Sequence, residues 1–317
     1  MNCLCCGKPL RLEDEQNGWH KRCIKRFFGT SVLPNIEINE KTLELLAIES
    51  TNKGYTVPGV QKKLSLHLIS EGGRPRLTLL NYPTGYILKP QVKDFRSLPE
   101  AEQLVMCMAD AVGIATVPHA LVLGNGSYAY ITKRVDRVFE KNNKVRILAM
   151  EDFCQLDLRL TQDKYKGSYE RCSKIIQKYS SRAMLDLTEL YMRLVFSYLV
   201  GNSDMHLKNF SLIETAEGSG LYVLSPAYDL LPVNIIMPED EEQFALTMNG
   251  KKTNIRKNDF LVFADECDIS RSAAEKMIGK LVSMKHNLII MCRESLLPED
   301  LKEHFISLIE ERSKIFI

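Results

Sequence analysis

The sequence predicts an α+β fold with two lobes, a β-rich first lobe followed by a helical second lobe. Residues 63–69 alternate between apolar and polar side chains, which is the period of a half-buried strand. Apolar residues between Leu187 and Tyr198 instead recur every three or four positions, which is the period of a helix. The expected boundaries are 1–30 for a cysteine-rich segment, 31–134 for the first lobe and 135–317 for the second lobe.

The first lobe is expected to contain an antiparallel meander, one helix and a hairpin. The meander strands are predicted at residues 63–69, around Leu77 and Leu79, and at 86–89. A helix is predicted from Ser97 to Val112, because Ser97 begins a capping box and Gly113 ends the apolar run. The turn Gly124-Asn125-Gly126 predicts a hairpin between two further strands.

Composition and charge exclude several classes of protein. Hydrophobic residues make up 45% and charged residues 26% of the 317 residues, an ordinary balance for a folded chain. The net charge of +2 gives no overall attraction to nucleic acid, membranes or acidic substrates. The sequence has no apolar run of about 18 residues and no N-terminal signal pattern, so we expect a cytoplasmic protein without a membrane partner. Its nine cysteines fit reduced thiols better than a disulfide framework.

Residues 201–210 are the segment most informative about chemistry. The sequence Gly-Asn-Ser-Asp-Met-His-Leu-Lys-Asn-Phe follows an apolar helix and is too polar to be buried entirely. Asp204 and Asn209 have the spacing at which one loop supplies a carboxylate base for a hydroxyl and an amide oxygen for Mg²⁺. A hydroxyl can approach a triphosphate only when metal ions neutralise its charge, so this pair predicts a phosphoryl-transfer loop.

Asp229 and Lys89 supply two further parts that phosphoryl transfer needs. Asp229 follows an aromatic residue beyond an apolar run and is predicted to hold Mg²⁺, although an isolated aspartate at a strand end is more often a cap or turn residue. Lys89 ends an apolar strand and is predicted to bind nucleotide phosphates, with Glu102 as its ion-pair partner. The alternative is that Lys89 extends to solvent and Glu102 lies on a solvated helix face.

Taken together and in this order, these segments resemble the HipA family of bacterial kinases. The segments that carry the resemblance are Thr56-Val57-Pro58-Gly59-Val60-Gln61-Lys62-Lys63, Ile87-Leu88-Lys89-Pro90, Glu102 to Ala109, Lys133-Arg134-Val135-Asp136-Arg137, Glu151-Asp152-Phe153-Cys154-Gln155, Asp204 to Ser211, and Pro226-Ala227-Tyr228-Asp229. The resemblance implies a two-lobed protein-kinase-like fold that uses ATP and Mg²⁺ to phosphorylate serine or threonine in proteins.

The resemblance also implies a role for each site residue. Asp204 becomes the catalytic base, and Asn209 and Asp229 become the metal ligands. The implied nucleotide-binding residues are Lys89, His206, the phosphate-loop residues Val57, Pro58, Gly59 and Val60, and the adenine-binding hinge Thr132, Lys133 and Arg134.

Regulation and partners follow from the same resemblance. The family autophosphorylates a serine in the phosphate loop; Thr56 holds that position here, and its phosphate would compete with ATP for the same site. Pro58 stands where the HipT branch can carry a second serine. The short sequence before the loop resembles HipT-type toxins, which implies a HipS-like small protein and a HipB-like antitoxin, with DNA contacted only through the antitoxin. Aminoacyl-tRNA synthetases are among the family's targets, so the expected role is a toxin that stops translation in the bacterial cytoplasm.

Four candidate metal ligands lie in the cysteine-rich segment. Cys3-x-x-Cys6 and His20-x-x-Cys23 flank 13 residues, a spacing that suits a tetrahedral Zn²⁺ site. Cys5 interrupts the pattern, and the alternative is that these thiols pack as small apolar side chains.

Three rival functions share the predicted chemistry or fold. A small-molecule phosphotransferase would use the same Asp-to-Asn loop and metal-binding aspartate. A kinase-like effector with another protein target, or a binding module that has lost catalysis, would keep the fold. The joint presence of Lys89, Asp204, Asn209 and Asp229 argues against loss of catalysis.

Overall fold

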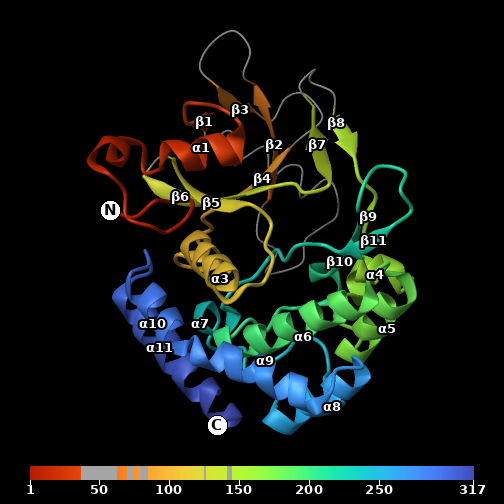
Figure 1. The fold of residues 1–317 in the computed structure, drawn as a ribbon. Helices are drawn as coiled ribbons and strands as arrows, with labels where there is room; N and C mark the ends of the chain where they lie inside the picture. The colour runs from red at the N-terminus through yellow and green to blue at the C-terminus, as the bar shows by residue number, and fades with distance from the viewer. Residues whose placement is uncertain (37–62, 70–74, 79–84, 125, 141–144) are drawn as a thin grey trace. The chain divides into compact units, whose positions relative to one another are not determined.

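The computed structural model describes residues 1–36, 63–69, 75–78, 85–124, 126–140 and 145–317. The chain divides into two compact units, which Figure 1 shows in ribbon form. The first unit comprises Met1–Gln103 and Val117–Val135, and the second comprises Leu104–Thr116 and Asp136–Ile317. Within the described ranges, none of the helices has the length and apolar character needed to cross a bilayer.

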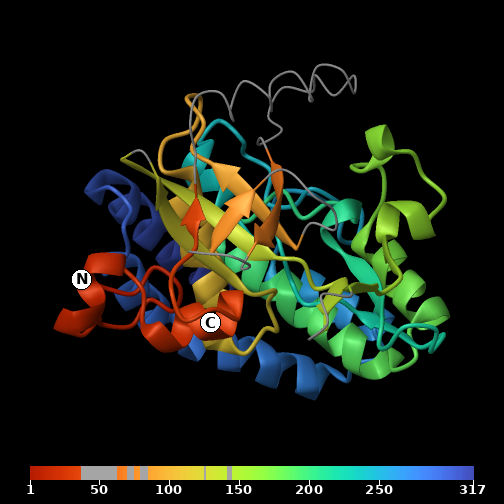
Figure 2. The same ribbon diagram turned by 90° about the horizontal axis from the view of Figure 1, so that it is seen from above.

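A six-stranded sheet forms the centre of the first unit. Its strands are β1 (Asn35–Ile36), β2 (Leu64–Ile69), β3 (Arg76–Thr78), β4 (Tyr86–Pro90), β5 (His119–Gly124) and β6 (Ser127–Lys133). Their order across the sheet is β1-β3-β2-β4-β6-β5, and Figure 2 shows these strands from above. β1 runs parallel to β3, and every other pair is antiparallel.

The predicted meander is wrong in its strand pairing. β4 pairs with β2 rather than with β3, so that Leu64 lies opposite Leu88 and Leu66 lies opposite Tyr86. All four of these side chains are buried, and pairing β4 with β2 places their apolar rows together. β3 has only three residues and pairs with the far end of β2.

The predicted hairpin and helix are confirmed. β5 and β6 pair along their whole length, from His119 opposite Thr132 to Gly124 opposite Ser127. The helix α3 spans Leu98–Val112, within one residue of the prediction, and Gly113 follows it with φ of 90°. Only a glycine takes this backbone angle without strain, which explains why the helix ends here.

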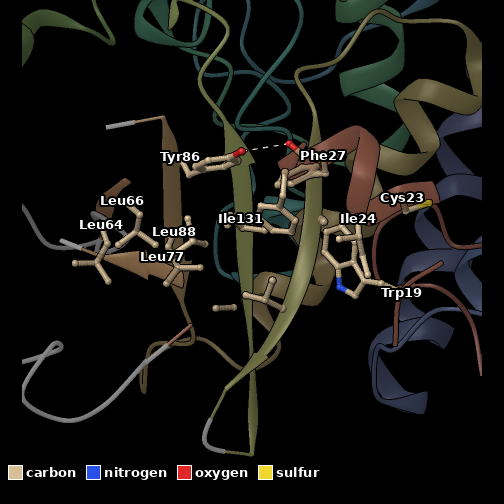
Figure 3. Close-up of a cluster of buried hydrophobic side chains, with 14 of the residues drawn as sticks. Trp19, Cys23, Ile24, Phe27, Leu64, Leu66, Leu77, Tyr86, Leu88 and Ile131 are labelled. Carbon is tan, nitrogen blue, oxygen red and sulfur yellow. Dashed lines mark hydrogen bonds between the residues drawn. The ribbon is translucent and has the colours of Figure 1, made fainter. Parts of the chain in front are cut away.

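The N-terminal segment contributes much of the first unit's core. It contains a 3₁₀ helix, η1 (Leu12–Asn17), and the helix α1 (Lys21–Phe28). The Trp19 ring lies 5.5 Å from Phe27 and 5.4 Å from Phe28, centroid to centroid. Figure 3 shows this cluster continuing to Ile131 and to Tyr86, whose hydroxyl donates to the carbonyl of Phe27. The cysteine-rich segment is therefore an integral part of this unit's core.

The second unit is mainly helical. Its helices are α4 (Phe153–Leu156), α5 (Tyr169–Tyr179), α6 (Ala183–Val200), α7 (Val233–Ile236), α8 (Lys257–Glu266), α9 (Arg271–Ser283), α10 (Lys285–Arg293) and α11 (Glu299–Ser313), with 3₁₀ turns η2 (Thr161–Asp163), η3 (Leu207–Asn209) and η4 (Lys314–Phe316). β7 (Arg137–Phe139) pairs with β8 (Val145–Ile147), and β10 (Ser211–Glu214) lies between β9 (Met150–Asp152) and β11 (Tyr222–Leu224). The C-terminal half of α6 is buried on every side, so α6 is the central helix of this unit.

Phe27→Ala should lower the free energy of unfolding of the first unit by about 3–5 kcal/mol, because it removes a buried ring from the aromatic cluster. Denaturant titration followed by fluorescence of Trp19, the single tryptophan, measures this change. Leu12→Ala is the matched control, since Leu12 is 89% exposed in the same unit, and it should leave the midpoint unchanged. A loss below about 1 kcal/mol for Phe27→Ala would contradict the observed packing.

Candidate active site

The loop that carries Asp204 begins at the end of α6. Gly201 ends the helix with φ of 71°, a conformation that side chains other than glycine rarely adopt. A Cβ atom at this position would also lie 3.2 Å from both terminal carbons of Leu308. The chain therefore needs glycine here to leave α6 in the direction of the loop.

Buried neighbours hold Asp204 in place. Met205 and Leu207 are at most 1% exposed, and the hydroxyl of Tyr169 donates to the carbonyl of Met205 at 3.1 Å. Before the aspartate, the hydroxyl of Ser203 donates to Asp240 Oδ2 at 2.7 Å. The Asp204 side chain itself is 46% exposed. A buried backbone thus presents one accessible carboxylate.

Asn209 is joined directly to the backbone of Asp204. Its Nδ2 donates to the carbonyl of Asp204 at 3.2 Å, and the turn η3 places the Asn209 amide N–H on the carbonyl of His206. Because Nδ2 serves as the donor, the amide oxygen is the atom that a metal ion would contact. The structure therefore brings together the two residues that the spacing predicted.

Tyr165 and His206 surround the Asp204 carboxylate. The hydroxyl of Tyr165 donates to Asp204 Oδ1 at 2.8 Å, while His206 Nε2 lies 4.0 Å from Oδ2. The two rings meet edge to face with centroids 5.1 Å apart. His206 is thus beside the predicted base, and its role toward a nucleotide stays a prediction.

The charge environment of Asp204 favours a proton acceptor. Partial removal from solvent raises the pKa of the Asp204 carboxyl, and the negative charges of Asp229 and Asp240 raise it further. The Tyr165 hydrogen bond and the Lys164 ammonium act in the opposite direction and lower this pKa. A carboxylate with a raised pKa binds a hydroxyl proton more strongly than an ordinary aspartate does.

Asp229 follows β11 and adopts φ of 56°. The preceding Tyr228 fixes this segment, because its hydroxyl lies 2.5 Å from Ser211 Oγ and donates to the carbonyl of Lys208 at 3.1 Å. Carboxylate and amide oxygens are the ligands that Mg²⁺ prefers, and a divalent cation would offset the repulsion between Asp229 and Asp204. Asn209 and Asp229 therefore fit the metal chemistry predicted for them.

Lys89 and Glu102 form a buried ion pair in the first unit. Their side chains are 4% and 2% exposed, and Nζ lies 2.5 Å from Oε1. The ammonium also lies 5.2 Å from the centroid of the Tyr130 ring. The solvent-exposed alternative for this pair is thus wrong. Binding of phosphate by Lys89 stays a prediction.

The predicted hinge residues use their backbone N–H groups inside the first unit. The amide of Lys133 donates to the carbonyl of Pro118, and that of Arg134 donates to the carbonyl of Gly85, each at 2.9 Å. The hydroxyl of Thr132 also donates to Pro118, at 3.0 Å. Contact with adenine through these two backbone amides would have to replace existing hydrogen bonds.

The phosphate-loop predictions fall on residues outside those that the structure describes. They concern Thr56, Val57, Pro58, Gly59 and Val60.

Tyr165 is the site residue that the sequence did not predict. It lies 39 residues before Asp204 in the chain, in a polar stretch without regular periodicity. Nothing in that local pattern signals a contact with the loop.

The four predicted zinc ligands lie together in the first unit. The ligand atoms of Cys3, Cys6, His20 and Cys23 are all within 4.8 Å of one another, so this cluster could hold a metal ion. None of the nine cysteines forms a disulfide bond.

Comparison with known proteins identifies relatives of this chain. The family model described as HipA-like C-terminal domain matches residues 55–288. The protein named Putative kinase Y4mE from Sinorhizobium fredii is 29% identical over 234 residues, covering 72% of this chain and 54% of that protein. The protein named Putative kinase from Haemophilus influenzae is 24% identical over 329 residues, covering 94% of this chain and 92% of that protein. The chain spans about half the length of Y4mE and of the similar Sinorhizobium protein Y4dM.

Two solved structures have a similar fold. HipA of Shewanella oneidensis, solved with HipB and its operator DNA, has a TM-score of 0.68 at 20% identity, covering 82% of this chain and 64% of that chain. The Helicobacter pylori proinflammatory kinase CtkA has a TM-score of 0.53 at 16% identity, covering 80% of this chain and 94% of that chain. These similarities show the predicted two-lobed kinase-like α+β fold.

Glu102→Leu should destabilise the first unit by about 3–5 kcal/mol, because it leaves the buried ammonium of Lys89 without this carboxylate. Adding Lys89→Met should restore most of the lost stability, since the double variant buries no charge at this position. Denaturant unfolding followed by Trp19 fluorescence compares the two variants with the unaltered chain. A double variant less stable than Glu102→Leu alone would contradict this account of the pair.

Proposed function

The chain belongs to the HipA-like C-terminal domain family, and we propose that it is an ATP-dependent kinase that phosphorylates serine or threonine in a protein target. One observation carries the proposal. The loop after α6 presents the Asp204 carboxylate with a raised pKa and links it, through a hydrogen bond to its carbonyl, to the metal-binding amide of Asn209. An accessible base beside a magnesium ligand is the arrangement that phosphoryl transfer to a hydroxyl requires.

Each predicted site residue has a specific task in this proposal. Asp204 accepts the proton of the attacking hydroxyl, and Tyr165 orients its carboxylate. Asn209 and Asp229 hold Mg²⁺, which when bound neutralises the phosphates of ATP. Lys89 binds a phosphate group while Glu102 holds its ammonium in place.

For the biological role, we propose a toxin of a toxin–antitoxin system. The relevant support is that Shewanella HipA, similar in fold, was solved with HipB and operator DNA. The partners proposed here are a HipB-like antitoxin, through which DNA is reached, and a HipS-like small protein, with an aminoacyl-tRNA synthetase as the target. Autophosphorylation of Thr56 would add negative charge to the phosphate loop and oppose ATP binding. The HipS-like partner, the synthetase target and Thr56 rest on the family resemblance alone.

Asp204→Asn should reduce phosphorylation of protein by about 10²–10⁴-fold, because the amide cannot accept the hydroxyl proton. The purified chain is incubated with labelled ATP, Mg²⁺ and a bacterial lysate, and phosphorylated sites are identified by mass spectrometry. Asp265→Asn is the matched control, since Asp265 forms an exposed pair with Arg271, and it should retain full activity. The same experiment detects phosphate on Thr56.

Two outcomes would overturn the protein-kinase proposal. Phosphate that appears only on small molecules would favour the small-molecule phosphotransferase. Undiminished protein phosphorylation by Asp204→Asn would remove Asp204 from the reaction. Phosphorylation of a protein that has no part in translation would support the kinase function but contradict the proposed aminoacyl-tRNA synthetase target.

Tyr165→Phe should shift the acidic limb of the kcat/KM profile to higher pH. The hydroxyl of Tyr165 stabilises the ionised form of Asp204, so removing it raises the pKa of the carboxyl further. The base would then be protonated over more of the acidic range, and activity would fall more in mildly acidic than in mildly alkaline buffer. Tyr179→Phe, on an exposed ring elsewhere in this unit, is the control. An equal loss at every pH would contradict this role for Tyr165.

A further inference from the structure

The N-terminal Cys/His cluster has the chemistry of a structural metal site. We propose that Cys3, Cys6, His20 and Cys23 bind one Zn²⁺, and that the bound ion holds the N-terminal segment against β5 and α3. Three thiolates and one imidazole are a common ligand set for structural zinc. Four protein ligands fill a tetrahedral site and leave no position for substrate, so this ion would stabilise structure and take no part in the phosphoryl transfer proposed above.

The surroundings of His20 select the nitrogen that binds the metal. Its Nε2 lies 2.9 Å from the carbonyl of Pro9, and a carbonyl can only accept a hydrogen bond. Nε2 therefore carries the proton, and Nδ1 has the lone pair. Nδ1 is the atom that lies among the thiols, 3.4 Å from Cys6 Sγ and 3.7 Å from Cys23 Sγ. A histidine ligand oriented by a backbone carbonyl is the usual arrangement around zinc.

The backbone brings the four ligands together from two short elements. The amide of Cys3 donates to the carbonyl of Lys8 and that of Gly7 donates to the carbonyl of Cys3, which closes a tight turn around Cys6. His20 is the residue before α1, and Cys23 lies in the first turn of that helix. The amide of His20 also donates to Cys3 Sγ at 3.4 Å, which holds this sulfur beside the histidine.

The position of Cys5 distinguishes a metal site from simple packing of apolar thiols. Its sulfur is not part of the set of ligand atoms that all lie within 4.8 Å of one another, and it lies 4.0 Å from the carbonyl of His119. The cysteine that interrupted the sequence pattern is thus outside the ligand set. Cys6 is only partly buried, yet its sulfur still turns toward His20, an orientation that burial of an apolar thiol does not require.

The cluster is linked to the edge of the six-stranded sheet. Leu4, next to the first ligand, accepts a hydrogen bond from the amide of Leu121 at 2.8 Å. Trp19, next to the histidine ligand, donates from Nε1 to the carbonyl of Leu121 at 3.2 Å. Both backbone groups of one residue on the edge strand β5 are thus satisfied by neighbours of the ligands, which protects an edge that would otherwise be open.

A second link reaches α3. The side chain of Gln103 donates from Nε2 to the carbonyl of Cys5 at 3.2 Å, and its Oε1 lies 2.8 Å from His119 Nδ1. Gln103 follows Glu102, the partner of Lys89. The turn from Cys3 to Lys8, which we call the zinc turn, is therefore joined through Gln103 to the turn of α3 that carries Glu102.

Metal analysis of the full chain, purified in reducing buffer without chelator, should find one zinc per chain. Cys6→Ser and Cys23→Ser should lose most of it, whereas Cys5→Ser is the matched control and should keep it. A chain without zinc that also fails to give the intense visible absorption of tetrahedral thiolate-bound Co²⁺ would overturn the proposal. Equal loss of zinc in Cys5→Ser and Cys6→Ser would overturn the ligand assignment. Metal content does not depend on catalysis, so an inactive chain that binds zinc would refute only the proposed kinase function.

Hydrogen exchange of the unaltered chain tests the structural role of the ion. Removing zinc with a chelator should speed exchange of the Leu121 amide by about 10-fold or more, because its acceptor lies in the zinc turn. The amides of β10 in the second unit should exchange at an unchanged rate. An exchange rate of the Leu121 amide that stays the same after zinc is removed would overturn the proposed coupling between the metal site and β5.

Discussion

A buried lysine in an apolar strand imposes the main constraint on the first unit. Lys89 is 3% exposed on β4, between β2 and β6, and a charge buried there needs compensation, which the Glu102 carboxylate supplies at ion-pair distance. This requirement fixes the first turns of α3 over the strand. Gln103 then ties the same helical turn to the cysteine-rich segment. The core, the ion pair and the proposed zinc site are therefore parts of one connected structure.

In the second unit the main constraint is that the loop after α6 exposes the Asp204 carboxylate while the neighbouring residues of the loop stay buried. Buried Met205 and Leu207 anchor the loop after Asp204, the Ser203 hydrogen bond anchors it before, and Gly201 gives it the necessary exit from α6. The second half of the loop returns to Asp204 through the amide of Asn209. The loop backbone fixes the position of this acid, the Tyr165 hydroxyl orients its carboxylate, and its proton affinity depends on Tyr165 and the neighbouring acids.

Local patterns predicted the local features of this protein. The period of α6, the glycine after α3 and the five-residue spacing from Asp204 to Asn209 each depend on residues close together in the chain. The pairing of β4 with β2 depends instead on which apolar rows meet between strands that are not adjacent in the chain. The contact of Tyr165 with Asp204 and the exclusion of Cys5 from the four-residue metal-ligand cluster likewise arise from tertiary packing. None of these has a signature at short range in the sequence.

The most direct test of the central claim is a crystal structure of the chain with Mn²⁺ and a non-hydrolysable ATP analogue. The account predicts an anomalous manganese peak in contact with Asn209 Oδ1 and the Asp229 carboxylate, with the ammonium of Lys89 on a phosphate oxygen and Asp204 free of the metal. An ordered analogue whose metal and phosphates contact none of Asn209, Asp229 and Lys89 would contradict it.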